Sequence, residues 1–277
     1  MTHDAKTALH KARQHLALAG SPSAARDASA LMDKVQGDAP PWTPLSDVQM
    51  AQLDGYIQRR ARREPISHIV GKRAFWMHDF EVSPDVLDPR PETETLVDVA
   101  RQQPFDTVLD LGTGSGCILL SLLYEHRDAR GLGVDLSAAA LDVARRNAQI
   151  VGVSDRVTWR VSDWFGDVGT RFDLIVSNPP YIAEDEMPGL APELGFEPRM
   201  ALTDGADGLT NYRILTRDAP RHLRHGGRLM VEIGATQAAP VTALFQKAGF
   251  QQITVHPDLD GRDRVISGVF SPQTDSF

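Results

Sequence analysis

A short segment of four residues bears most directly on chemistry: Asn178, Pro179, Pro180 and Tyr181 (NPPY). Its prolines remove two backbone donors and stiffen the chain, which leaves carbonyl oxygens exposed. The Asn178 side-chain oxygen and the Pro179 carbonyl could accept both hydrogens of a planar amide or aromatic amine, and would support the positive charge that builds as its nitrogen attacks a methyl group. The Tyr181 ring can stack on a flat substrate. In isolation the segment is equally typical of a rigid turn at the exit of a strand, so its place in the fold decides its interpretation.

A glycine-rich segment, Gly112–Gly116 (GTGSG), follows an apolar run and predicts a tight turn that approaches a ligand closely. A dinucleotide fingerprint would place its third glycine at Cys117, so the spacing excludes that class of site. No pair of a lysine and a hydroxyl residue follows the glycines, which also excludes a phosphate-binding P-loop. The residues of this candidate cofactor site are Gly112, Thr113, Gly114, Ser115 and Gly116.

Three later residues indicate which cofactor this is. Asp135 ends an apolar run about 20 residues after the glycines, where a carboxylate can accept hydrogen bonds from a ribose diol; taken alone, it equally suits a helix N-cap. Asp163 can accept from the exocyclic amine of adenine and Trp164 can cover its face, or they are a capping aspartate and a core tryptophan. Adenine and ribose without a phosphate site indicate S-adenosylmethionine, whose carboxylate would lie at the helix N-terminus near Gly116.

Alternating strands and helices after Pro104 would bring these segments together. Strands are predicted at 107–111, 131–135, 157–161, 172–177 and 228–233, with helices at 117–125, 138–151, 212–223 and 240–248. The last two strands, 252–255 and 264–270, can form an antiparallel pair. The alternation predicts an α/β fold, with a mostly parallel sheet of seven strands covered on both faces. Ligands of such sheets bind at the carboxyl ends of the strands, which is where every candidate segment falls.

The chain before this sheet has a different pattern. Apolar residues at helical spacing predict helices up to about residue 70, one of them opened by a capping box at Ser46 and Gln49. Alternation in 75–82 predicts a strand or hairpin, and the proline-rich segment 88–93 reads as a junction. We therefore predict a helical domain at 1–72, a hairpin linker at 73–90 and the sheet domain at 91–277. The basic stretch of Arg59, Arg60, Arg62 and Arg63 is interpreted as a solvated helix face.

Bulk properties restrict the class of protein. The 277 residues have a formal net charge of −8, which argues against stable nucleic-acid binding, since proteins that hold duplexes usually have a basic footprint. No apolar run approaches the roughly 20 residues that span a bilayer, and the N-terminal stretch lacks the core of a signal peptide. The nine histidines show no metal-ligand pattern, and the single cysteine cannot form an intramolecular disulfide. We expect a soluble, cytoplasmic monomer without a metal or a membrane.

The chain resembles the HemK/PrmC family, the glutamine N5-methyltransferases that modify peptide-chain release factors. The likeness covers nearly the whole sequence and includes Arg63–Pro65, Ile69–Gly71, Phe75, Pro89–Glu94, Asp110–Gly116, Asp135, Asn178–Tyr181, Phe196–Pro198, Asp207–Leu209, Glu232–Gly234, Gly249–Phe250 and Asp258–Arg264. It implies a helical substrate-docking domain, a β-hairpin linker and a Rossmann-like methyltransferase domain that uses S-adenosylmethionine. The implied substrate is the glutamine of the Gly-Gly-Gln motif in release factors, with the amide held by Asn178, Pro179 and Tyr181.

The resemblance also implies that Asp135 holds the ribose, that Trp164 lies at the adenine, and that Thr93 and Glu197 assist at the cofactor or substrate side. Two residues depart from the family pattern. Asp88 stands where an apolar residue is usual before Pro-Arg-Pro, and His68 replaces the commoner tyrosine. Both lie outside the cofactor and acceptor motifs, so they bear on the junction and on partner docking.

Two other functions remain open from the residues alone. An adenine-N6 methyltransferase acting on DNA or RNA could use the same NPPY geometry, although it would have to expose its base and contact the nucleic-acid backbone. A cofactor-binding protein that has lost activity is the other alternative, but a pure binder has no need of acceptor geometry.

Overall fold

The structure is a computed structural model that describes residues 2–271. Its contacts divide the chain into two compact units. The helical unit runs up to Lys72 and also includes Ala191–Phe196, whereas the sheet unit holds Arg73–Leu190 and the chain from Glu197 onward. The segment Ala191–Phe196, which follows Asn178–Tyr181 in sequence, therefore folds as part of the helical unit.

The helical unit is built on four helices whose apolar faces meet in one core, centred on Leu16, Leu31 and Leu53. Ser46 and Gln49 form the predicted capping box, because the Ser46 hydroxyl accepts from the Gln49 amide and the Gln49 side chain accepts from the Ser46 amide. The elements are β1 (Thr2–His3), α1 (Ala5–Leu18), α2 (Ala24–Gln36), β2 (Leu45–Ser46), α3 (Asp47–Ala61) and α4 (Ile66–Val70).

The basic stretch at the end of α3 is not the solvated face that its sequence suggested. Arg60 is only 4% exposed, and its Nε donates to Asp27 Oδ2 of α2 at 2.7 Å. Arg60 and Arg63 also pair with Glu193, which belongs to the segment that folds with this unit. Arg60 lies three residues after the buried Ile57, so helical periodicity directs it inward, and a charge there needs a partner.

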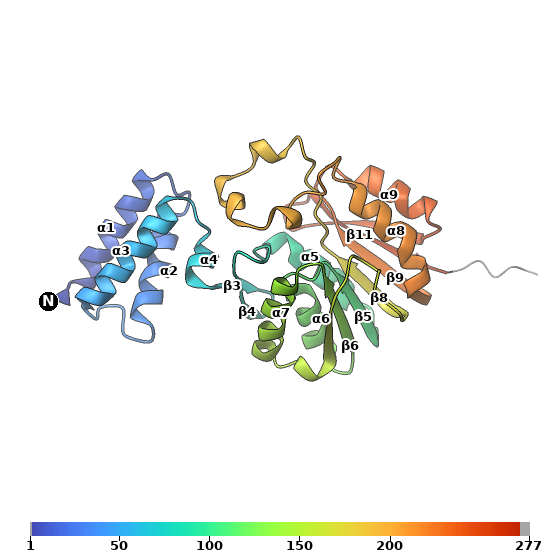
Figure 1. The fold of residues 1–277 in the computed structure, drawn as a ribbon, viewed down its shortest axis with the longest axis horizontal. Coiled ribbons are helices and arrows are strands. Elements are labelled where there is room, and N and C mark those ends of the chain that lie inside the picture. The colour runs from blue at the N-terminus through green and yellow to red at the C-terminus, as the bar shows by residue number, and fades with distance from the viewer. Residues whose placement is uncertain (1, 272–277) are drawn as a thin grey trace, which may run out of the picture. The chain divides into compact units, whose positions relative to one another are not determined.

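The sheet unit holds a seven-stranded sheet in the order β10-β11-β9-β8-β5-β6-β7 (Figure 1). Only β10–β11 and β11–β9 pair antiparallel, so the predicted α/β fold with a mostly parallel sheet is confirmed. The strands are β5 (Thr107–Leu111), β6 (Arg130–Asp135), β7 (Val157–Val161), β8 (Phe172–Ser177), β9 (Leu223–Glu232), β10 (Gln251–Pro257) and β11 (Asp263–Phe270). Ahead of them, β3 (Lys72–Phe75) and β4 (His78–Glu81) form a two-stranded sheet, and a 3₁₀ turn, η1 (Pro91–Thr93), leads into the first helix.

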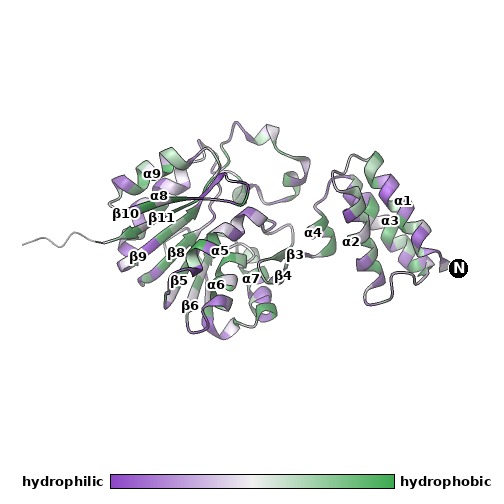
Figure 2. Cartoon of the chain, turned by 180° about the vertical axis from the view of Figure 1, so that it is seen from behind, coloured by the Kyte–Doolittle hydropathy of each residue, from purple (hydrophilic) through white to green (hydrophobic). Residues whose placement is uncertain are grey.

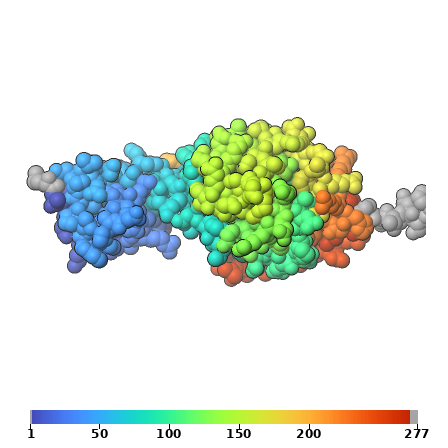
Figure 3. All heavy atoms as spheres, turned by 90° about the horizontal axis from the view of Figure 1, so that it is seen from below, coloured from blue at the N-terminus to red at the C-terminus, as the bar shows by residue number. Residues whose placement is uncertain are grey.

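Alternate residues along the strands build two separate cores. Val108 and Val176 point into a core with α5 (Glu94–Arg101), α6 (Cys117–Glu125) and α7 (Ala138–Val151). Leu109 and Ile175 point into the other core, with α8 (Thr210–His222) and α9 (Ala238–Lys247). The central strands are mostly green in Figure 2 because both of their faces are covered. In Figure 3 the yellow-green atoms around α7 and β7 form part of the surface of this unit.

One element differs from the sequence prediction. We expected a helix at 212–223 and a strand at 228–233, but β9 begins at Leu223. Leu223 pairs with Phe172 and Arg228 pairs with Leu174, so the residues between them bulge out of the ladder around Gly226, which has a φ of +76°. None of the helices in residues 2–271 combines the length and apolarity needed to cross a membrane.

Removing the partner of Arg60 will destabilise the helical unit. We expect Asp27→Ala to lower its free energy of unfolding by about 3 kcal/mol or more, because Arg60 would lose its closest carboxylate while still buried. Asp33→Ala, an exposed aspartate on the same helix, should change it by less than about 0.5 kcal/mol. Urea unfolding followed by circular dichroism measures both, and equal losses would contradict a structural role for the buried pair.

Candidate active site

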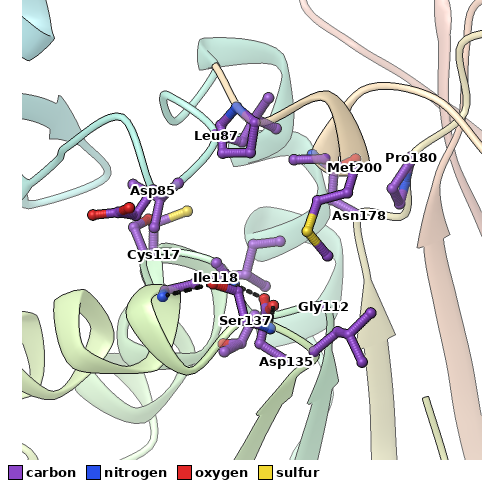
Figure 4. A pocket seen from close by; sticks show the side chains of 18 of the residues that line it. Asp85, Leu87, Gly112, Cys117, Ile118, Asp135, Ser137, Asn178, Pro180 and Met200 are labelled. Carbon is purple, nitrogen blue, oxygen red and sulfur yellow. Dashed lines mark hydrogen bonds between the residues drawn. The ribbon is translucent and has the colours of Figure 1, made fainter. Parts of the chain in front are cut away.

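A cavity of about 440 Å³ opens at the carboxyl ends of β5, β6 and β8, within the size range of small-molecule sites (Figure 4). The predicted residues that line it are Thr93, Gly112, Thr113, Gly114, Ser115, Asp135, Asp163, Trp164, Asn178 and Pro180. Four candidates do not line it, and these are Gly116, Pro179, Tyr181 and Glu197. The view in Figure 4 shows Leu87 and Met200 across the opening from Asp135 and Gly112; sequence reasoning had singled out neither as a site residue.

The glycine turn has the backbone that its sequence predicts. Gly112, Gly114 and Gly116 have φ values of +71°, +55° and +81°, in the region that side chains avoid. A Cβ on Gly114 would meet nothing within 4 Å, so the turn offers open backbone to the cavity. A Cβ on Gly116 would lie 3.0 Å from Leu120, so that glycine serves the packing of α6.

Asp135 joins two segments at the cavity. Its Oδ2 accepts from the Gly114 amide at 2.9 Å and its Oδ1 accepts from the Ser137 amide at 2.9 Å. It is not the N-cap of α7, since the Ser137 hydroxyl accepts from the Ala140 amide in that role. Burial raises the pKa of Asp135, while the backbone hydrogen bonds from Ser137 and Gly114 oppose the rise. Each carboxylate oxygen keeps a second lone pair for a ligand hydroxyl.

A second carboxyl, Asp110, lies beneath the turn; it belongs to the family likeness, but the sequence analysis assigned it no role. It is fully buried, and its Oδ2 accepts from the Thr113 hydroxyl at 2.7 Å. Burial raises its pKa to about 7, despite that hydrogen bond. A charged residue within the apolar run of β5 was the signal that could have indicated it. Asp110 supports the shape of the turn from below.

Trp164 lines the cavity and also packs on the core, while its contact with adenine stays a prediction. Its ring lies beside the turn, with atoms 3.8 Å from where a Cβ of Gly112 would be, and it also packs on the core formed with α8 and α9. Its φ of +47° is unusual for a bulky residue, and the Ser162 hydroxyl donates to its carbonyl at 2.9 Å. Asp163 is exposed at the same edge.

The acceptor turn, Asn178–Tyr181, is held by its neighbours. Asn178 Nδ2 donates to the Thr93 hydroxyl at 3.3 Å, which leaves the Asn178 side-chain oxygen as an acceptor at the cavity. The Pro180 carbonyl accepts from Asn211 Nδ2 at 2.8 Å, and Pro179 is buried. The hydroxyl of Tyr181 donates to Glu232 Oε1 at 3.4 Å, so it is directed away from the cavity; stacking of its ring on a substrate stays a prediction.

Residues that follow the turn in sequence pack closely against it. A Cβ on Gly208 would lie 2.4 Å from the Tyr181 carbonyl oxygen, and Gly208 has a φ of +74°. Gln237 Nε2 donates to both the Tyr181 and Gly208 carbonyls, at 3.0 and 3.2 Å. Sequence reasoning missed Gln237, which no local pattern marks.

Glu197 ties the junction before η1 to the segment after the acceptor turn. Arg90 donates to Glu197 Oε1 at 2.6 Å and the Asp88 amide donates to Oε2 at 3.3 Å. Burial raises the pKa of Glu197, and the positive charge of Arg90 counteracts it. The unusual Asp88 is buried between two cations, with its carboxylate 3.7 Å from Arg90 and 3.8 Å from Arg73.

A parallel sheet with a glycine turn after β5, an acidic residue ending β6 and an NPPY turn after β8 defines a methyltransferase, and residues 83–256 match the methyltransferase small domain family. Residues 7–71 match the PrmC N-terminal domain family. A solved methyltransferase from Pyrococcus furiosus shares the fold, with a TM-score of 0.55 and 17% identity over 77% of this chain and 98% of that one.

The sequence is 50% identical over 270 residues to the release factor glutamine methyltransferase of Cereibacter sphaeroides, covering 95% of this chain and 97% of the relative. It is 42% identical to the corresponding enzyme of Rhodospirillum rubrum, over 93% of this chain and 82% of the relative. The chain belongs to the release factor glutamine methyltransferase family. The predicted family and enzyme class are therefore confirmed.

The close approach at Gly208 predicts a sharp effect of one added methyl group. We expect Gly208→Ala to lower methyl transfer about 10- to 100-fold, because the clash with the Tyr181 carbonyl would displace the acceptor turn. Gly205→Ala is the matched control, since Gly205 also has a positive φ but open space around it, and it should lose only about 1 kcal/mol of stability. Initial rates measure the effect on methyl transfer, and urea unfolding measures the effect on stability. Equal rates for Gly208→Ala and Gly205→Ala would show that the close approach to Tyr181 does not matter for the reaction.

Proposed function

We propose that this chain transfers the methyl group of S-adenosylmethionine to the side-chain amide nitrogen of the glutamine in the Gly-Gly-Gln motif of peptide-chain release factors, and so modulates translation termination. The observation that carries the proposal is the Asn178 side chain, whose amide nitrogen is engaged by Thr93 while its oxygen stays free beside the cofactor-sized cavity. An oxygen held in this way can accept from a substrate N–H without first reorganising.

The residues at the strand ends fit S-adenosylmethionine. The Asp135 carboxylate is already oriented by two backbone amides and can accept from the ribose hydroxyls. Trp164 and Asp163 stand at the same cavity edge, where they would contact the adenine. The turn from Gly112 to Ser115 leaves backbone open beside the methionine end. When bound, the cofactor supplies an electrophilic methyl group on a positively charged sulfur.

The chain's own contribution is then orientation and electrostatics. The lone pair of a planar amide is delocalised, so the nitrogen must be held in line with the methyl group. Asn178 Oδ1 and the Pro179 carbonyl would accept the two N–H groups and become better partners as positive charge develops on the nitrogen. A new C–N bond would form as the methyl group's bond to sulfur breaks, with that electron pair left on sulfur, and the nitrogen would lose its extra proton to solvent water.

The family supports a release factor as substrate, since the relatives from Cereibacter sphaeroides and Rhodospirillum rubrum are release factor glutamine methyltransferases. We propose that the helical unit docks the release factor. The adenine-N6 alternative would use the same oxygen atoms, but the formal net charge of −8 disfavours a nucleic-acid substrate.

Methyl transfer should depend on the acceptor turn and on one glutamine. Labelled methyl from S-adenosylmethionine should appear on a purified release factor, but not on one whose Gly-Gly-Gln glutamine is replaced, nor on duplex DNA. Asn178→Ala should lower this rate about 100-fold or more while keeping cofactor affinity, because a preorganised hydrogen-bond partner is lost. Label that appears on DNA alone would show that the substrate is a nucleic acid and not a release factor. An undiminished rate in Asn178→Ala would show that Asn178 does not take part in methyl transfer.

Cofactor affinity should depend on Asp135. We expect Asp135→Asn to weaken S-adenosylmethionine binding about 10- to 100-fold, since a charged acceptor for the ribose becomes a neutral amide. Asp142→Asn, an exposed aspartate on α7, is the control and should bind as the unmodified protein does. Titration calorimetry gives both constants, and equal affinities would remove Asp135 from the ribose.

A further inference from the structure

A buried carboxyl lies directly behind the acceptor turn. Glu232 is the last residue of β9 and is only 1% exposed. Its Oε1 accepts from the Tyr181 hydroxyl at 3.4 Å, and its Oε2 has no hydrogen-bond partner among the residues that the structure describes. Glutamate is almost never fully buried without a partner, and an unmatched oxygen in the interior destabilises the fold. The position therefore needs an explanation other than stability.

The same carboxyl adjoins the residue that holds Asn178. The Thr93 hydroxyl lies near enough to Glu232 to lower the pKa of that carboxyl, and it accepts from Asn178 Nδ2 at 3.3 Å. Both ends of the acceptor turn thus converge on one group, Tyr181 directly and Asn178 through Thr93. These contacts come from three separate elements, namely β9, η1 and the chain after β8.

The backbone around Glu232 is itself fixed. The hydroxyl of Tyr212, on α8, donates to the Glu232 carbonyl at 2.8 Å. The Arg264 guanidinium, on β11, donates to the Ile233 carbonyl at 3.1 Å. This anchored backbone keeps the Glu232 side chain beside the turn, where its carboxyl can orient the Tyr181 hydroxyl.

We propose that Glu232 is a positioning residue for methyl transfer, whose carboxylate holds the hydroxyls of Tyr181 and Thr93 and thereby sets the orientation of Asn178. This inference rests on the proposed function, because it concerns the geometry of that acceptor turn. Glu232 does not line the cavity, so it acts through its neighbours and leaves cofactor binding to the residues already described.

The ionised form is the one that suits this role. A carboxylate accepts hydrogen bonds on both oxygens, whereas a protonated carboxyl turns one oxygen into a donor. Burial and the negative charge of Glu232 raise the pKa of Tyr181, so its hydroxyl stays a donor at neutral pH. A buried negative charge near the turn would also favour the positive charge that develops on the substrate nitrogen.

Glu232 titrates within the pH range in which methyl transfer can be measured. Burial raises its pKa to about 7, against the lowering effects of the Thr93 hydroxyl, the Arg264 guanidinium and the Tyr181 hydroxyl. The titratable or charged groups that face it are Glu92 on η1, Cys117 on α6, Tyr181 after β8, Tyr212 on α8 and Arg264 on β11. Methyl transfer should therefore rise between pH 6 and 8 as Glu232 loses its proton.

The first test compares Glu232→Gln with the unmodified protein, using labelled S-adenosylmethionine and a purified release factor across pH 6 to 8. We expect kcat to fall about 10- to 100-fold at pH 8, the range of a lost hydrogen bond to a charged group, and the inflection to disappear. Cofactor affinity by calorimetry should stay within about twofold. Asp110→Asn is the matched comparison, because Asp110 is the other buried carboxyl whose pKa is raised to about 7.

A second variant keeps the inference testable if Glu232→Gln does not fold. Tyr181→Phe removes a single hydroxyl, one of the groups that lower the pKa of Glu232, so the inflection should move to higher pH and kcat should fall. A merely structural Glu232 would leave the inflection unmoved.

The outcomes separate this inference from the proposed function. Failure of the unmodified protein to methylate a release factor would overturn both. Normal methylation with an unchanged kcat in Glu232→Gln would overturn the positioning role alone. An inflection that disappears only in Asp110→Asn would assign the pH dependence to the cofactor turn, and would also overturn the role of Glu232.

Discussion

The pairing of β5 with β8 is the constraint on which the site depends. These parallel strands are adjacent in the sheet although their sequences lie far apart, and the buried Ser177 hydroxyl donates to the Leu111 carbonyl at 2.7 Å, where the two strands end. The glycine turn and the acceptor turn therefore leave the sheet side by side. A cofactor on one and an amide on the other would meet without any large movement of the backbone, because both turns are extensions of the same rigid sheet.

Ionisable side chains at the end of a sheet that is covered on both faces lower the stability of the fold. Asp110 and Glu232 are both buried, and burial raises each pKa to about 7, above the values of 3.8 and 4.5 for free side chains. Each carboxyl binds its proton more tightly in the folded protein, so this stabilising contribution is complete below about pH 4 and is lost as the pH rises through about 7. At neutral pH the sheet thus carries charge that destabilises it, near the carboxyl ends of β5 and β9.

The segment after the acceptor turn shows how function is spread along the chain. Within a short stretch, Glu193 folds with the helical unit through Arg60 and Arg63, and Glu197 binds Arg90 beside η1. Gly208 then packs against the Tyr181 carbonyl. Glu193, Glu197 and Gly208 thus each hold a different part of the loop that begins at Asn178.

The sequence by itself determined the fold class, the family and the segments that meet at the cavity, because glycine and proline turns and the periodicity of apolar residues are local signals. Only the tertiary structure decided that Arg60 is buried, that Tyr181 is directed away from the cavity, and that Glu232 lies behind the turn. Those facts depend on which strands are neighbours and on which side chains fill the space between them. Helical periodicity directs Arg60 inward, but its pairing with Asp27 and the burial of Glu232 are properties of the packed interior that no local pattern encodes.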